Sequence, residues 1–177
     1  NASVTTGSLY HHFSGKDELF VEVCVEGMRI LLRRLQTAAQ LTEGRPTVER
    51  FLALFDAYVA FYIEERGYFE LMERLQRGRD SFSIGQELAD RVDASGDHIV
   101  DEMVNLLGET EPGLDPDELR KRVLFAVALS EGLVACDRRN LLARFDTQLG
   151  AFRGIVASMA EHLVAGADGR GGGGQGQ

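Results

Sequence analysis

The stretch Thr5-Thr6-Gly7-Ser8-Leu9-Tyr10-His11-His12-Phe13-Ser14-Gly15-Lys16-Asp17-Glu18-Leu19-Phe20 contains two helical patterns separated by a break. Leu9, His12 and Phe13 have the spacing of one helix face, and Ser14-Gly15 then interrupts that pattern. Asp17 follows Ser14 by three residues, which is the spacing of a helix-capping pair before an apolar run. The stretch therefore predicts a short helix, a tight turn and a second helix.

The other face of the short helix has no acidic residue. It carries small hydrogen-bonding groups and two rings, from Thr6, Gly7, Ser8, Tyr10 and His11. Such a face can lie against phosphates and base edges without like-charge repulsion. The alternative interpretation is an ordinary capped helix pair that happens to expose a tyrosine.

The run from Thr6 to Leu19 resembles the recognition helix and following turn of TetR-type transcriptional regulators. The resemblance rests on a motif: a small residue, Leu-Tyr-x-His-Phe, a two-residue turn, Lys, an acid and Leu. The rest of the chain matches the family only in length and helical layout. The resemblance implies a homodimeric repressor that binds palindromic operator DNA in the major groove and releases it when a small-molecule effector binds. The DNA contacts it implies are Thr5, Thr6, Gly7, Ser8, Tyr10, His11, His12 and Lys16.

In that family two helices precede the recognition helix, whereas here only Asn1-Ala2-Ser3-Val4 precede it. We therefore expect the sequence as given to begin inside the DNA-binding motif, without its first two helices. Residues 1–38 hold as many basic as acidic residues, although the whole chain has a net charge of −9. Because phosphate binding needs positive charge, we expect the preceding helices to supply Lys and Arg.

The composition favours a globular, all-α protein. Period-2 alternation of β-branched residues is absent, and 177 residues fit one domain with a small appendage. Cys24 and Cys136 do not have the spacing of metal ligands, and the sequence shows neither a leader pattern nor a long apolar run. We therefore expect a reduced, cytoplasmic setting. No nucleophile elbow, phosphate loop or Cys/His pair is present, so we expect neither an enzyme nor a cofactor.

Apolar spacing and start signals predict helices at about 16–39, 47–65, 68–76, 84–107, from 115–116 through 136, and 141–164. The first of these should bury Leu19, Val23, Gly27, Ile30 or Leu31, and Leu35. We favour close packing of another helix over a bend as the reason for Gly27. The expected domains are 1–38 for the partial DNA-binding unit and its linking helix, 39–165 for ligand binding and dimerisation, and 166–177 as a disordered Gly-rich tail.

The helix through residue 136 is apolar nearly all round, and the last expected helix has a heptad seam of Phe145, Leu149, Phe152, Val156, Met159 and Leu163. Each helix also has a row of small residues spaced four apart. The first row includes Gly132 and the second includes Gly154. Two such helices have more apolar surface than one subunit needs, so we expect them to pair with a second copy in a four-helix bundle. The alternative is a purely internal core.

A ligand cavity is expected among the helices of residues 40–137, lined by Phe55, Tyr58, Tyr62, Phe69, Met72, Met103, Phe125 and Leu129. These side chains imply a largely apolar or aromatic ligand. Glu131 is the acid within an apolar run and faces either a polar or cationic ligand group or the dimer seam, beside a residue such as Arg153. The acids Asp93, Asp97 and Asp101 near His98 are interpreted as a solvated face rather than a metal site. The rival function is a ligand-sequestering or interaction module without DNA binding.

Overall fold

The computed structural model describes residues 13, 15–78, 85–110 and 113–165, and within them it contains helices and no strand. The all-α prediction is confirmed. The elements in chain order are α2 (Lys16–Leu41), α3 (Thr47–Glu64), α4 (Arg66–Gly78), α5 (Gln86–Gly108), α6 (Pro116–Arg138), α7 (Leu141–Arg144), the 3₁₀ turn η1 (Leu149–Phe152) and α8 (Arg153–Ala165).

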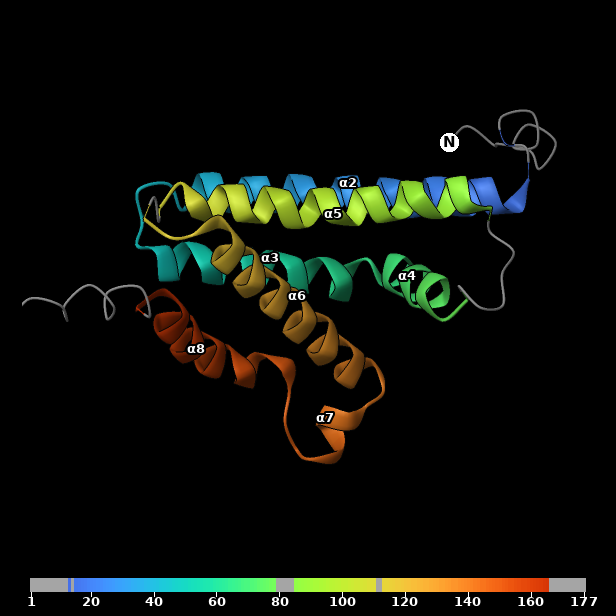
Figure 1. The fold of residues 1–177 in the computed structure, drawn as a ribbon. Helices are drawn as coiled ribbons and strands as arrows, with labels where there is room; N and C mark the ends of the chain where they lie inside the picture. Colours follow the sequence, from blue (N-terminus) through green and yellow to red (C-terminus); the bar gives the residue numbers. More distant parts are fainter. Residues whose placement is uncertain (1–12, 14, 79–84, 111–112, 166–177) are drawn as a thin grey trace, which may run out of the picture.

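The two long helices α2 and α5 lie side by side and run in the same direction (Figure 1). Helix α3 returns along them and leads into α4, α6 crosses α3 and contacts α5, and α8 packs on α3. The core lies where these helices meet, and its fully buried side chains include Leu31, Leu54, Phe61, Leu107 and Val123. None of the helices in the described ranges is both long and apolar enough for a membrane span.

The buried stripe of α2 differs in part from the sequence prediction. Leu31 and Leu35 are buried as expected, but Leu19 and Val23 are only half-buried. The residues that fill the rest of the stripe are Val21, Cys24, Val25, Met28 and Ala39. Helix α2 has apolar residues on two adjacent faces, so periodicity alone predicted the stripe from Gly27 onward but not its first turns.

Gly27 lies against the ring of Tyr68, the third residue of α4. A Cβ built on Gly27 would lie 2.4 Å from Cδ1 of Tyr68, which is closer than carbon atoms can approach. The Tyr68 ring in turn stacks on Phe61, with ring centroids 5.9 Å apart. Gly27 is therefore explained by close packing of α4 on α2, which is the interpretation that the sequence favoured.

The single helix expected at 141–164 is wrong. The helix breaks after α7, where Asp146 has a left-handed backbone with φ 52°, and the chain is extended at Gln148 before it turns into η1. Aspartate tolerates this conformation better than most residues, and the amide of Thr147 closes the turn by donating to the Leu142 carbonyl at 3.1 Å. The heptad seam is lost as a result: Phe145 is 73% exposed, whereas Val156 and Ala160 of α8 are buried.

Helix α6 buries one face only in this single chain. Its buried residues, Leu119, Val123, Ala126, Ser130 and Val134, recur at intervals of three and four. The Ser130 hydroxyl is satisfied within the helix by donating to the Ala126 carbonyl at 2.8 Å. Leu124 and Phe125 are about half exposed. The nearly uniform apolar composition of this helix therefore reflects two apolar faces, of which the subunit's own core covers one.

Candidate functional site

A cavity of about 460 Å³ lies among five helices, α2 to α6. Its volume falls in the range of small-molecule sites. The lining residues are Met28, Leu31, Tyr58, Tyr62, Met72, Val92, Asp93, Gly96, Asp97, Ile99, Val100, Val127 and Glu131.

A second, smaller cavity of about 300 Å³ adjoins the first, since the two share Tyr62, Met72 and Glu131. It extends between α4 and α6, and its remaining lining residues are Phe69, Glu73, Ala128, Gly132 and Ala135. The flexible Met72 side chain lies between the two spaces, and methionine adapts readily to differently shaped contents. The two cavities therefore offer one irregular site with two lobes.

Two tyrosines of α3 and one acid of α6 form the polar part of the wall. The Tyr58 hydroxyl donates to Oε1 of Glu131 at 3.1 Å, and the ring centroids of Tyr58 and Tyr62 are 5.2 Å apart. Burial raises the pKa of Tyr62 to about 12 and that of Tyr58 well above its ordinary value. Burial also raises the pKa of Glu131, which the hydrogen bond from Tyr58 partly offsets. Both hydroxyls thus remain protonated near neutral pH.

The expected cavity residues fall into two groups. Tyr58, Tyr62 and Met72 line the larger cavity, and Phe69 lines the smaller one. Phe55 and Met103 are 6% and 2% exposed in the core, Phe125 is 47% exposed, and Leu129 packs at the edge of the core; these four line neither cavity. Glu131 lies in the wall of both cavities.

Sequence reasoning missed the walls formed by α2 and α5. Met28 and Leu31 of α2 line the larger cavity, although this helix was expected only to link the two parts of the chain. Asp93 and Asp97 are solvent-exposed as expected, but they also line the cavity. Their i, i+4 spacing beside the apolar stripe of α5 was the available signal. No group of three or more His, Cys, Asp or Glu within the described ranges is placed to hold a metal ion.

The residues implied as DNA contacts lie almost entirely outside the described part of the chain, which covers Lys16 but not Thr5, Thr6, Gly7, Ser8, Tyr10, His11 or His12. Lys16 is the first residue of α2, and its side chain is exposed. The helix that forms a wall of the cavity therefore begins directly after the segment expected to bind DNA.

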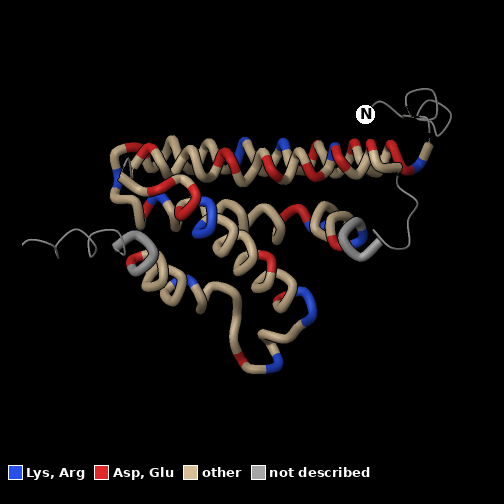
Figure 2. Tube along the Cα trace, viewed as in Figure 1, with Lys and Arg blue, Asp and Glu red and all other residues tan. Residues whose placement is uncertain are grey.

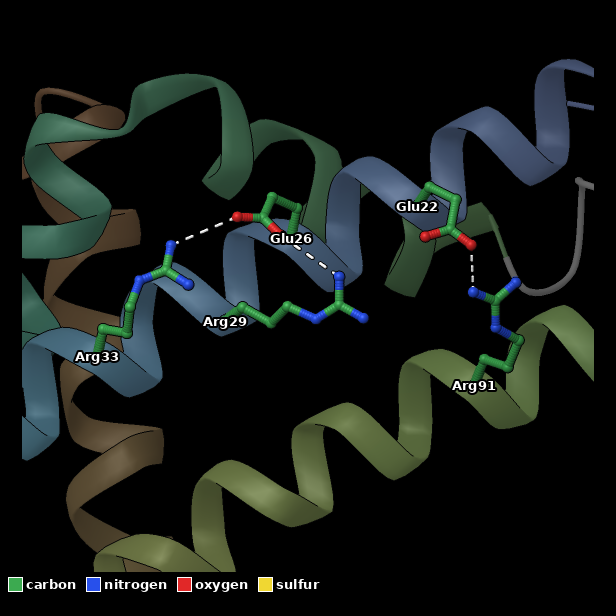
Figure 3. Close-up of polar contacts among 5 residues, drawn as sticks. All are labelled: Glu22, Glu26, Arg29, Arg33 and Arg91. Carbon is green, nitrogen blue, oxygen red and sulfur yellow. Dashed lines mark hydrogen bonds and ion pairs between the residues drawn. The ribbon is translucent and has the colours of Figure 1, made fainter. Parts of the chain in front are cut away.

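An ion pair connects α2 to α5 near that end. Arg91 of α5 pairs with Glu22 of α2, while Glu26 binds Arg29 and Arg33 along the outer face of α2 at 3.4 Å each (Figure 3). Figure 2 shows charged positions along both helices, and Arg91 is the only Lys or Arg of α5, which has six acidic residues. Arg91 directly precedes Val92 and Asp93, which line the cavity. The α2–α5 junction and the cavity wall thus share one segment of α5.

Comparison with known proteins supports the resemblance seen in the sequence. The family model described as "Bacterial regulatory proteins, tetR family" matches residues 1–23. A solved structure, titled "Structure of a protein with unknown function from Rhodococcus sp. RHA1", is similar with a TM-score of 0.68 and 20% identity, over 94% of this chain and 80% of that chain. At that identity the likeness shows a shared helical fold alone. No curated protein matches the chain.

Proposed function

We propose that this chain, a TetR-type transcriptional regulator by its amino-terminal segment, is a repressor released from its operator by a small, largely apolar or aromatic ligand. The single observation that carries the proposal is the position of α2. This helix follows the DNA-binding segment directly and contributes Met28 and Leu31 to the cavity wall. A ligand between α2 and α5 is therefore in contact with the helix that holds the DNA-binding segment.

Release from DNA then follows from a shift between two conformations. The cavity ligand favours whichever arrangement of α2 and α5 fits it better, and it shifts the equilibrium only by its difference in affinity for the two. Two contacts of α2 near the DNA-binding segment are the pair of Glu22 with Arg91 and the close packing of Gly27 on Tyr68. Either contact transmits a displacement of α5 or α4 to the DNA-binding segment.

Pairing of two chains through α6 and α8 is the second part of the proposal. Leu124 and Phe125 of α6 and Ile155 of α8 are 47–57% exposed large apolar side chains. Gly132 and Gly154 have no atom within 4 Å of an added Cβ, so a second chain has room to approach both helices closely. A twofold dimer places its two reading helices about 34 Å apart, one turn of DNA.

The DNA-binding part is tested by gel shift with the upstream intergenic DNA, using the full-length protein. Tyr10→Ala and Lys16→Ala should each weaken binding, because they remove a phosphate-facing hydroxyl or charge. Asp101→Ala is the control, since Asp101 lies on α5 and pairs with Arg120 of α6. Absence of salt-sensitive binding at low micromolar protein would refute the regulator and favour the sequestering module.

The pairing is tested by light scattering coupled to size-exclusion chromatography. Phe125→Asp should convert a dimer into a monomer, because it would bury an unpaired charge at the contact. Leu41→Asp is the matched control: Leu41 is 80% exposed at the end of α2, and its replacement should leave the mass unchanged. A dimer that persists in Phe125→Asp places the contact elsewhere.

A further inference from the structure

The charged residues that line the two cavities all have the same sign. The larger cavity has Asp93, Asp97 and Glu131 in its wall, and the smaller one shares Glu131 and adds Glu73. Neither set of lining residues contains Lys, Arg or His in the part of the chain that the structure describes. The chain as a whole has a net charge of −9, which adds to the negative potential at the opening.

These carboxylates lie at different depths. Asp93 and Asp97 of α5 are exposed and mark the open side, while Glu131 of α6 is half-buried beside the rings of Tyr58 and Tyr62. Tyr58 and Tyr62 are 4% and 5% exposed, so only a small part of each residue borders the cavity, at its inner end. The remaining wall is aliphatic or thioether, from Met28, Leu31, Met72, Val92, Ile99, Val100 and Val127.

We propose that the effector is an organic cation: a protonated amine or quaternary ammonium on an apolar or aromatic body, with its charged group against Glu131, Tyr58 and Tyr62. The inference rests on the proposed function in that it names the chemical class of the effector for the same cavity. Aromatic faces attract cations, and the attraction grows when water is excluded. Glu131 supplies the counter-charge at the same place, and the aliphatic wall accommodates the body of the ligand.

The same walls disfavour other ligand classes. An anionic ligand would place its charge among carboxylates and find no basic lining residue within the described ranges. A neutral ligand of the same shape would fill the apolar space but leave Glu131 without a positive partner from the ligand. Glu131 is half-buried between the two cavities, and this burial disfavours its ionised form and raises its pKa. A cation relieves that cost, whereas a neutral ligand does not.

The experiment compares three probes of one shape and different charge: phenylbutylamine, phenylbutanol and phenylbutyrate. Each is titrated into the purified chain by isothermal calorimetry at neutral pH. The amine should bind about tenfold more tightly than the alcohol, because a hydrogen bond to a charged group exceeds a neutral one by about that factor. The anion should bind most weakly of the three.

Glu131→Gln removes the charge while its amide oxygen still accepts the hydrogen bond from Tyr58. It should reduce the preference for the amine over the alcohol to about twofold or less, since the charge contribution is lost. Glu49→Gln is the matched control, since it removes one acid from an exposed position of α3 outside both cavities. Should Glu131→Gln fail to fold, Asp97→Asn removes another carboxylate of the larger cavity, at its opening, and should reduce the preference for the amine by a smaller factor.

Three results would overturn the proposal. They are binding of the alcohol as tight as or tighter than that of the amine, a preference for the amine that survives in Glu131→Gln, and no heat from the amine at its solubility limit. The calorimetric measurement does not involve DNA, so the cation proposal can fail or succeed independently of the regulator proposal. Selective amine binding by a protein that fails to bind its operator would leave the cation site standing and refute the repressor. Operator release by the alcohol but not by the amine would support the repressor and refute the cationic effector.

Discussion

Replacement of Gly27 by alanine should destabilise the protein, although alanine is the better helix former. An added Cβ would lie 2.4 Å from Cδ1 and 2.8 Å from Cγ of Tyr68, and Cγ is fixed close to the α4 backbone. Forcing a methyl group into such a contact costs about 1–3 kcal/mol. The gain in helix propensity is about 1 kcal/mol. We expect a net loss of up to about 2 kcal/mol in the free energy of unfolding, with α4 displaced from α2.

Gly96→Ala supplies the matched control. Gly96 lies in the interior of α5, and nothing lies within 4 Å of its added Cβ. The same chemical change should therefore stabilise the protein, by up to about 1 kcal/mol. Urea denaturation followed by circular dichroism, at one fixed protein concentration and without ligand, gives both values.

A double-mutant cycle identifies the cause. In a Tyr68→Ala background the clashing ring is absent, so Gly27→Ala should change sign and stabilise the protein by up to about 1 kcal/mol. If Gly27→Ala destabilises equally with and without the Tyr68 ring, the close packing of α4 on α2 is not the reason for the glycine. Stabilisation by Gly27→Ala in the parent protein would refute the reasoning outright.

Three further predictions concern Arg138 and Cys24. Arg138 donates to the Tyr62 carbonyl at 2.5 Å and lies 4.5 Å over the Phe69 ring. Arg138→Met should therefore lower the free energy of unfolding by about 2 kcal/mol. Arg139→Met is the control and should change it little, because the Arg139 side chain is 70% exposed. Burial raises the pKa of Cys24 from 9.0 to about 11, so iodoacetamide at pH 8 should modify the half-buried Cys136 and leave Cys24 intact until the protein unfolds. Because the unfolded thiol ionises first, stability should also fall between pH 9 and 11, and less steeply in Cys24→Ala.

Several helix starts could be predicted from sequence because each depends on local signals. Lys16 follows a Ser-Gly break, Thr47 follows a proline, and Pro116 follows Asp115. Each of the three begins a helix as expected. The break at Asp146 could not be predicted in this way. The apolar spacing continues through it, and only the local backbone conformation and the Thr147 turn end α7 there.

The cavity was predicted in part. Tyr58, Tyr62, Phe69 and Met72 were expected to line it and do so, and Glu131, noted as the acid within an apolar run, accepts a hydrogen bond from Tyr58 in its wall. Phe55 has the same spacing as the tyrosines but points into the packed core. Helix periodicity separates buried from exposed faces, but it does not separate core from cavity, because that depends on how neighbouring helices cross.

Helix α6 connects the proposed effector site to the proposed dimer contact. Val127 and Glu131 line the larger cavity, while Leu124 and Phe125 of the same helix are exposed. A ligand that displaces Glu131 therefore also displaces the surface that we propose to meet the second chain. Coupling between two binding events is reciprocal, so pairing must alter effector affinity by the factor by which the effector alters pairing. Phe125→Asp should for this reason change the affinity for a cationic probe, even though Phe125 lines neither cavity.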